Sequence, residues 1–243
     1  MIEAVKGLSW KGYEGQDYEQ FWTGPGKQYL DRLERAIVSE ALTGGNTVVD
    51  IGAGFGRLAD CYIGKYRSVH MVEPAANLRQ IAERTYGSAA SYHEASVDDL
   101  PFPDESVDAV LMVRVFHHLG NPEVGLREIH RVLRKGGKLV FNYSNKRNVN
   151  RLIRYLLRRG ENPFSRGMEK YGPVLIGHHP GDVDDLLHVI GFEIERQYAT
   201  GIVDKVIDAA PPVRYLAVPS AVVARLLGPL RVAPAQFVVA QKR

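Results

Sequence analysis

Residues 46–59, NTVVDIGAGFGRLA, decide the fold. A short apolar run ends in Asp50, and glycines follow at every second position, Gly52, Gly54 and Gly56. Such a run is typical of a buried strand, and glycines let the backbone turn tightly and come close to a ligand. The stretch therefore predicts a strand that runs into a ligand-binding turn.

The spacing of the glycines excludes two common nucleotide-binding patterns. A dinucleotide fingerprint would place its third glycine at Arg57, whereas Gly56 comes one residue early. A phosphate loop would continue as Gly-Lys-Ser/Thr, which is absent here. A ligand with a carboxylate and an ammonium, but no pyrophosphate, fits better. We expect a helix N-terminus after the glycines to favour the carboxylate, and Asp50 to hold the ammonium.

The composition is that of an ordinary globular protein. The chain has 243 residues, of which 45% are hydrophobic and 24% are charged. Its net charge of +3 and isoelectric point of about 8.9 are too mild to indicate nucleic acid by themselves. A single cysteine excludes an internal disulfide, and no apolar leader or 18-residue apolar run occurs. We therefore expect a cytoplasmic protein with no transmembrane span.

Strand and helix patterns alternate along the chain. Strands are expected at 47–51, 68–74, 90–96, from 107 onward, 137–145, 191–198 and 235–243. Helices are expected at 26–42, 57–66, 77–87, 121–137 and after Pro180. This alternation predicts a parallel sheet with helices on both faces. Ligands bind such sheets at the carboxyl ends of the strands, where the glycine turn lies.

Glu73 is the second informative residue. It ends the second strand, 21 positions after Gly52, and a carboxylate there can accept two hydrogen bonds from vicinal ribose hydroxyls. The alternative is a solvated acid at a strand end. Because the acid and the glycine turn occur together, we favour the ribose role. A ligand with a carboxylate, an ammonium and a free ribose fits S-adenosylmethionine (SAM).

On these residues the chain resembles the class I SAM-dependent methyltransferases, most closely the small-molecule, methyltransferase domain 11-like type. VVDIGAGFG (48–56) resembles the first motif, VEPAANL (72–78) the ribose motif, and 95–141 the rest of the domain. The resemblance covers about 46–144. It implies an α/β fold with a Rossmann-like, doubly wound, seven-stranded sheet, mostly parallel with an antiparallel last strand. It also implies methyl transfer from SAM, with S-adenosylhomocysteine as the product and no metal.

The resemblance also implies a set of cofactor-binding residues. Asp50, Gly52, Ala53, Gly54 and Gly56 would hold the methionine end, Glu73 and Pro74 the ribose, Leu78, Ser96 and Val97 the adenine, and Val113 and Arg114 the sulfonium side. The family usually carries an acid at the position of Ser96, where it accepts a hydrogen bond from the adenine amino group. Ser96, Asp98 and Asp99 are the candidates for that bond here.

Histidines supply the catalytic candidates. His117 and His118 follow the fourth strand, and either one acts as a base toward the acceptor or both only pack and orient backbone. The pair at 178 and 179 precedes a proline and indicates a helix start rather than a zinc site. No metal ligands are expected.

The organisation expected is a single domain over 1–243. It has an N-terminal helical cap (1–45) that includes Tyr13, Tyr18 and Trp22, a cofactor-binding core (46–144) with Cys61 inside it, a lid insertion (145–180), and a C-terminal part (181–243) with a second insertion at 198–234. We expect the aromatic residues of the cap to cover the core, with a cofactor contact as the lesser alternative. The insertions would build an apolar, helical lid over the methyl group.

A basic amphipathic helix at 147–159 permits three interpretations. The favoured one is a lid helix whose apolar face packs on the core while its arginines stay in water. The others are peripheral membrane contact and RNA contact, and nucleic acid is disfavoured because aromatics are sparse here. We therefore expect a methyltransferase (EC 2.1.1.-) for a small, partly apolar acceptor that is lipophilic or anionic. The alternatives are SAM binding without turnover and RNA methylation; the oligomeric state is not indicated.

Overall fold

The computed structural model describes residues 20–171, 175–209 and 220–243. Tyr13 and Tyr18 of the expected cap lie outside the described residues, as do parts of both expected insertions.

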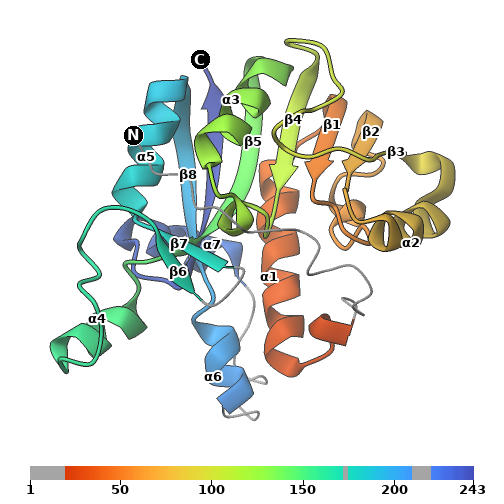
Figure 1. Cartoon of the computed structure of the whole chain (residues 1–243). Coiled ribbons are helices and arrows are strands. Elements are labelled where there is room, and N and C mark those ends of the chain that lie inside the picture. Colours follow the sequence, from red (N-terminus) through yellow and green to blue (C-terminus); the bar gives the residue numbers. More distant parts are fainter. Residues whose placement is uncertain (1–19, 172–174, 210–219) are drawn as a thin grey trace.

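The core of the molecule is a nine-stranded mixed sheet (Figure 1). Its strands are β1 (Gly45–Ile51), β2 (Tyr66–Val72), β3 (Ser91–His93), β4 (Val107–Met112), β5 (Leu133–Asn145), β6 (Glu169–Tyr171), β7 (Leu175–His178), β8 (Phe192–Thr200) and β9 (Ala235–Lys242). The order β3-β2-β1-β4-β5 is parallel, and β9 runs antiparallel between β5 and β8. The mostly parallel sheet with an antiparallel last strand is confirmed.

The two strands beyond the expected seven come from the expected lid. β6 and β7 form an antiparallel pair, and β7 joins β5 in parallel at Ser144 and Asn145. The edge of β5 that faces β4 is free there, because the pairing with β4 ends at Phe141, while β9 still pairs with Ser144 along the other edge. Part of the segment expected to be a helical lid therefore extends the sheet instead.

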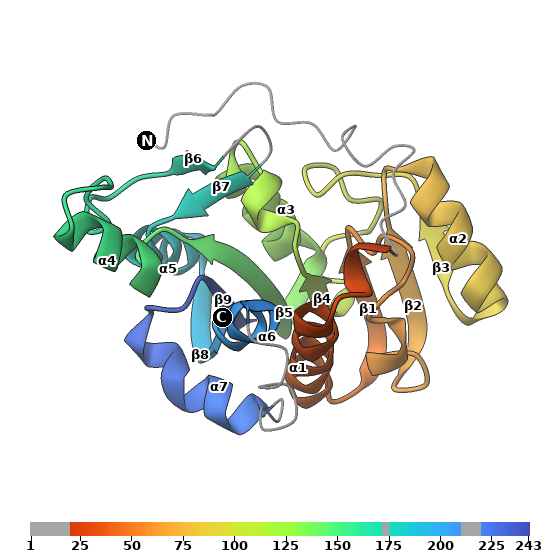
Figure 2. The same cartoon turned by 90° about the horizontal axis from the view of Figure 1, so that it is seen from below.

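Helices cover both faces of the sheet (Figure 2). They are α1 (Pro25–Ala41), α2 (Ala76–Tyr86), α3 (Pro122–Val132), α4 (Val149–Leu156), α5 (Pro180–Ile190), α6 (Val203–Ala209) and α7 (Ala221–Leu227). Successive strand residues point to opposite faces, so Val48 joins the core under α1 while Val49 joins the core under α3 and α5. The doubly wound arrangement is confirmed.

The helix expected at 57–66 does not form. Turns and a short 3-10 helix (Ala59–Cys61) replace it. Leu58, Ala59, Cys61 and Tyr62 are all buried in the core under α1, while Asp60 is exposed. Cys61 is a core residue as expected, but no helix N-terminus follows the glycines to favour a carboxylate.

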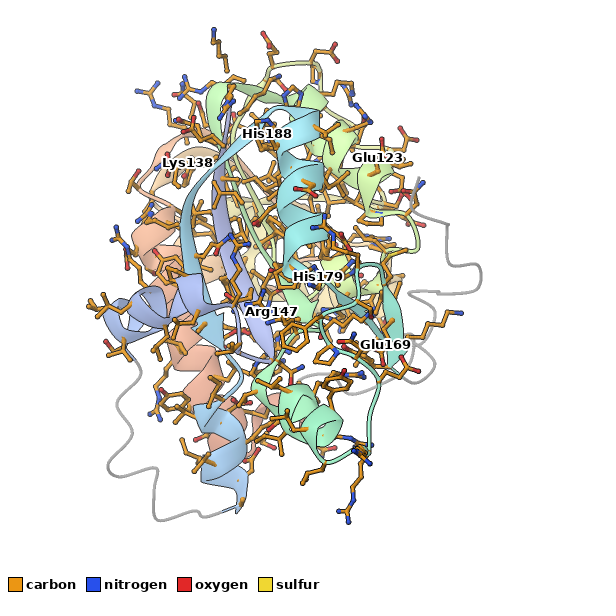
Figure 3. All side chains as sticks on the ribbon, turned by 90° about the vertical axis from the view of Figure 1, so that its left-hand side faces the viewer. Glu123, Lys138, Arg147, Glu169, His179 and His188 are labelled. Carbon is orange, nitrogen blue, oxygen red and sulfur yellow. The ribbon has the colours of Figure 1, made fainter. Side chains whose placement is uncertain are left out.

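The start of α5 agrees with the sequence. His179 caps the helix and accepts a hydrogen bond from the Gly181 amide at 3.2 Å, and Pro180 is the first helical residue. Figure 3 shows His179 at the lower end of α5, beside the segment that carries Arg147 and Glu169.

Candidate functional site

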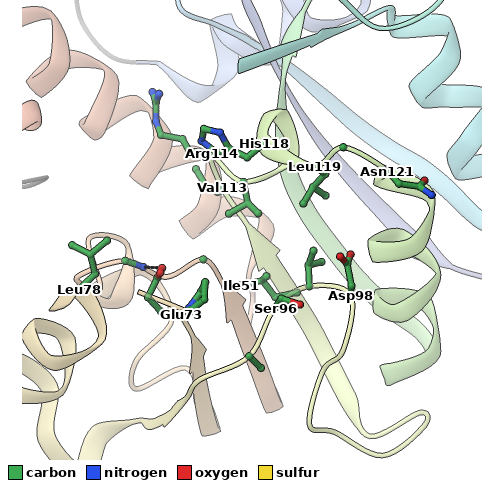
Figure 4. Close-up of a pocket in the computed structure, with 17 residues that line it drawn as sticks. Ile51, Glu73, Leu78, Ser96, Asp98, Val113, Arg114, His118, Leu119 and Asn121 are labelled. Atoms are coloured by element: carbon green, nitrogen blue, oxygen red, sulfur yellow. Dashed lines mark hydrogen bonds between the residues drawn. The ribbon is translucent and has the colours of Figure 1, made fainter. Parts of the chain in front are cut away.

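A cavity of about 270 Å³ lies at the carboxyl ends of the parallel strands (Figure 4). The strand order reverses between β1 and β4, which is where open α/β sheets bind ligands. The lining residues are Ile51, Gly52, Gly54, Glu73, Pro74, Leu78, Ala95, Ser96, Val97, Asp98, Val113, Arg114, Val115, His118, Leu119, Gly120 and Asn121. The ends of β1, β2 and β4 thus supply one shared site.

Gly52 and Gly54 shape the wall next to β1. Both have positive φ, +66° and +58°, which residues with side chains rarely adopt. A Cβ atom at Gly52 would lie 2.2 Å from the Val115 side chain, whereas a Cβ at Gly54 would meet no atom within 4 Å. Gly52 therefore permits close packing, and Gly54 leaves room in the cavity for a ligand.

Gly56 has a different environment. Its φ is +83°, and a Cβ there would lie 2.5 Å from the ring of Tyr86, whose hydroxyl donates to the Gly56 carbonyl at 3.0 Å. It lines neither the main cavity nor the small one described next. Packing on α2 explains this glycine, and its contact with a cofactor stays a prediction.

Asp50 and Ala53 lie in a small neighbouring cavity of about 40 Å³, which shares Gly52 and Gly54 with the main one. The Asp50 carboxylate is buried and accepts a hydrogen bond from the Tyr62 hydroxyl at 2.7 Å. Burial raises the pKa of Asp50 to about 7, although the Tyr62 bond and the positive charge of Arg57 act against the rise. An acid thus stands beside the glycine turn.

Glu73 lies in the wall of the main cavity. Its carboxylate accepts hydrogen bonds from the Gly54 amide at 2.8 Å and from the Ala75 amide at 2.9 Å. Burial raises the pKa of Glu73, while these two amides and Arg79 act to lower it. Each carboxylate oxygen has two lone pairs, so both can still accept a hydroxyl. Pro74 and Leu78 line the cavity beside it.

The loop after β3 forms the opposite wall. Ser96, Val97 and Asp98 line the cavity, and Asp99 is not among its lining residues. Burial, and then the negative charge of Glu128, raise the pKa of Asp98. Figure 4 shows Ser96 and Asp98 on the same side of the cavity. The structure thus brings two of the three adenine candidates to the site.

Val113 and Arg114, which follow β4, also line the cavity. The φ of Arg114 is +64°, an uncommon value for a residue with a side chain. Its amide donates to the Asn142 side-chain oxygen at 2.6 Å, which holds this backbone in place. Strained backbone of this kind is concentrated at binding sites.

A charged cluster between α1 and the cavity was not predicted. Glu34 is fully buried and pairs with Arg57 at 2.5 Å and with Arg114 at 2.8 Å. The guanidinium carbons of these arginines lie 3.8 and 4.7 Å from the ring centre of Trp22. Buried Trp22 thus packs on this charged cluster, and its role as a cover of the core stays a prediction. A sign was present in the sequence, since Glu34 follows Leu30 by four positions on the apolar side of α1.

The two candidate catalytic histidines differ in position. His118 lines the cavity and His117 does not. Burial lowers the pKa of His117 well below its usual range, and the positive charges of His118, Arg114 and His178 add to the effect. His117 is therefore neutral at ordinary pH, and the role of either histidine as a base stays a prediction.

Neither expected insertion lines the main cavity with its described residues. Ala199–Val203 and residues of α7 line a separate cavity of about 240 Å³ against Tyr29 and Leu33 of α1. The lid stays a prediction.

The described helices include none long and apolar enough to cross a membrane. Residues 20–171, 175–209 and 220–243 hold no group of three or more His, Cys, Asp or Glu side chains arranged for a metal; independence from metals stays a prediction.

Part of the chain is similar to known methyltransferases. Residues 49–141 match the family model described as a methyltransferase domain. An uncharacterized methyltransferase from Anoxybacillus flavithermus is 30% identical over 131 residues, which cover 52% of this chain and 61% of that protein. A ubiquinone/menaquinone biosynthesis C-methyltransferase from Rubrivivax gelatinosus is 29% identical over 106 residues, which cover 44% of this chain and 42% of that protein.

A likeness to a solved structure extends over nearly the whole chain. A SAM-dependent methyltransferase from Thermotoga maritima superposes with a TM-score of 0.64 at 21% identity, covering 93% of this chain and 95% of that one. At this identity the likeness shows the fold alone. The sequence matches to the two curated relatives span less than two thirds of their length.

Proposed function

We propose that this chain carries a class I SAM-dependent methyltransferase domain and that the protein transfers the methyl group of SAM to a small, partly apolar acceptor. The observation that carries the proposal is the buried Glu73 carboxylate, which accepts a hydrogen bond from the Gly54 amide at 2.8 Å in the wall of the main cavity. This hydrogen bond fixes a carboxylate, which suits a ribose, next to an accessible glycine backbone, which suits the amino-acid part of the same ligand.

Each end of SAM has a matching group in this site. Glu73 would accept hydrogen bonds from the ribose hydroxyls, and Asp50 would hold the ammonium. Leu78 and Val97 are buried side chains that also line the cavity, and they offer an apolar slot for adenine. Ser96 or Asp98 would accept a hydrogen bond from the adenine amino group.

The reaction asks mainly for positioning. SAM supplies an electrophilic methyl carbon, whose bond to sulfur breaks as its bond to the acceptor atom forms. The chain would orient the two partners and keep out water. Where the acceptor atom carries a proton, His118 would take it. We expect no metal requirement, because the displacement builds up no phosphoryl or tetrahedral charge.

The partly apolar acceptor is supported by the chemistry of the wall. Ile51, Ala95, Val113 and Leu119 line the cavity with aliphatic groups. The Rubrivivax relative is named for ubiquinone and menaquinone biosynthesis. Both observations favour an acceptor with apolar surface over a fully polar one.

The test is transfer of radioactive methyl from SAM into three acceptor pools: an organic extract, a polar small-molecule extract and total RNA. We expect label in the organic extract, and its loss with Glu73→Ala. Label in RNA alone would contradict a small-molecule acceptor. SAM binding without label in any pool would favour a binding protein without turnover.

A further inference from the structure

We propose that helix α4 and the loop after it form a docking surface for an anionic lipid bilayer. The proposal rests on this peripheral segment and not on the proposed methyl transfer. The α4 surface consists of exposed side chains of two kinds, apolar and basic: Ile153, Arg154, Tyr155, Leu156, Leu157, Arg158, Arg159 and Phe164.

The apolar side of α4 is turned to solvent. Helical spacing places Val149, Leu152, Ile153 and Leu156 on one side, a pattern that normally packs against a core. None of the residues of α4 is buried, and 71% of Leu156, 59% of Leu157 and 50% of Ile153 is exposed. The favoured interpretation, a helix with its apolar face on the core, is therefore wrong for α4. Apolar groups gathered in this way mark a contact surface.

The charge of the protein is concentrated in the same segment. Residues 145–170 contain eight lysines and arginines and two acids, an excess of six positive charges, while the whole chain has an excess of three. The rest of the chain is thus net negative by three. Ion pairs neutralise part of this excess, since Arg151 pairs with Glu169 and Arg166 pairs with Asp182 and Asp185 of α5. Glu161 is the exposed acid of the segment. Such a local excess is complementary to an anionic surface and not to a neutral one.

Aromatic side chains complete the surface. The rings of Tyr155 and Phe164 lie 6.5 Å apart, and the Arg147 guanidinium is 6.0 Å from the ring centre of Phe164. Rings and long basic side chains with a polar tip suit the boundary between lipid tails and water. The most exposed residues are aliphatic, which favours a bilayer over RNA, because RNA is bound by stacking on planar groups.

Helix α4 lies away from the main cavity and does not line it. In Figures 1 and 2, α4 projects from one side of the molecule and α2, whose Leu78 lines the cavity, lies on the other. Helix α7 also exposes apolar side chains, but its basic residue, Arg225, is shared with Glu40 at 3.5 Å. Exposed apolar side chains therefore occur at α4 beside Arg158 and Arg159, which have no acidic partner among the described residues, and this combination distinguishes α4 from α7.

Vesicle flotation with the full-length protein tests the proposal. Vesicles of phosphatidylcholine alone are compared with vesicles that contain about 30 mol% phosphatidylglycerol, at low salt and at about 0.5 M salt. We expect binding to the anionic vesicles at low salt, weaker binding at high salt, and little binding to neutral vesicles.

Matched variants locate the contact. Leu156→Glu and the double variant Arg158→Gln/Arg159→Gln should each weaken binding to anionic vesicles about tenfold. Leu226→Glu on α7 removes a leucine of equal exposure (73%), and Arg67→Gln/Arg84→Gln removes the same charge from other exposed positions. These controls should change binding less than about twofold. Thermal melting of every variant should match the parent, since all these side chains are exposed.

Three outcomes overturn the proposal. One is failure of the parent protein to bind anionic vesicles, including the case in which it binds a single-stranded RNA oligonucleotide instead. Another is an equal loss in the control variants, which would make the effect one of net charge. The third is a loss of S-adenosylhomocysteine binding in Leu156→Glu, which would make α4 part of a lid.

Discussion

Two buried carboxyl groups, Glu73 and Asp50, govern the candidate site at the scale of single residues. Burial raises the pKa of both, but the groups that oppose this rise differ. Glu73 is held by two backbone amides, whereas Asp50 accepts one hydrogen bond, from the Tyr62 hydroxyl, and feels the positive charge of Arg57. We therefore expect Glu73 to act as a fixed acceptor and Asp50 as a group that titrates in the ordinary pH range.

Glu73→Ala should weaken S-adenosylhomocysteine binding at least tenfold while the protein stays folded. A charge-assisted hydrogen bond contributes about 1.5–3 kcal/mol, less what water restores, and two such bonds would be lost. Calorimetric titration measures the loss, and far-ultraviolet circular dichroism checks the fold. Glu83→Ala, at an exposed position of α2, is the control and should bind normally. Unchanged affinity in Glu73→Ala would remove this residue from the ribose site.

The affinity for S-adenosylhomocysteine should rise about tenfold between pH 6 and pH 8, because a carboxyl with a pKa of about 7 ionises over that range and then pairs with the ammonium. The same raised pKa makes Asp50 costly to the fold in its charged form. Its effect on the free energy of unfolding is therefore absent below the unfolded pKa of about 4 and becomes unfavourable as the pH rises toward 7.

Asp50→Asn is the matched variant for this pH dependence. It should lose most of the rise in affinity and flatten the pH dependence of stability, both followed by titration and by thermal melting at each pH. If Asp50→Asn kept the full rise in affinity between pH 6 and pH 8, a titratable group other than Asp50 would be responsible for that rise.

At the scale of elements, the turn after β1 combines two glycines with different tasks. Gly52 packs against Val115, and its amide donates to the Val72 carbonyl at 2.7 Å. Gly54 is open on the cavity side and donates to Glu73. In this turn Gly52 thus packs into the core, and Gly54, two residues later, exposes its backbone to the cavity.

Alanine substitutions should separate these tasks. Gly52→Ala should lower stability by roughly 2 kcal/mol or more, because its Cβ overlaps Val115 and its φ is left-handed. Gly54→Ala should cost about 1–2 kcal/mol for the backbone alone, yet weaken S-adenosylhomocysteine binding strongly, since the new methyl group enters the cavity. Thermal melting and calorimetric titration of both variants provide the comparison. Equal effects on melting and on binding in the two variants would contradict this division.

At the scale of the whole molecule, the ligand cavity and the α4 surface lie at different places on one sheet. The cavity uses the ends of β1, β2 and β4, and α4 follows β5 beyond them. The described residues of the two expected insertions contribute nothing to the cavity wall. If α4 is part of a lid, ligand binding should affect it, whereas a separate docking surface at α4 should be unaffected by ligand binding.

Hydrogen exchange distinguishes these two roles. With S-adenosylhomocysteine we expect slower exchange at 50–56, 73–78 and 113–121, which border the cavities, and no change at 149–159. Exchange in the absence of ligand is the reference. Protection gained across 149–159 would establish the lid and remove α4 as an independent surface.

Local pattern was enough for most of the sheet and for the ligand edge. Alternating and continuous apolar runs mark β1, β2, β4, β5, β8 and β9, and Pro122 and Pro180 mark helix starts. The glycine turn and Glu73 could be placed together because parallel strands of similar length end at the same edge. These features depend on residues near one another in the chain, which a sequence displays directly.

Only the tertiary structure decided the remaining features, because each depends on partners distant in the chain. The segment around buried Leu58 and Tyr62 forms turns and a short 3-10 helix where the sequence pattern predicts a longer helix. The free edge at the end of β5 pairs with β7, and buried Glu34 joins Arg57 to Arg114 across more than 20 residues of sequence. The apolar face of α4 shows the converse: periodicity predicts which residues share a side of a helix, but the surrounding packing determines whether that side is covered.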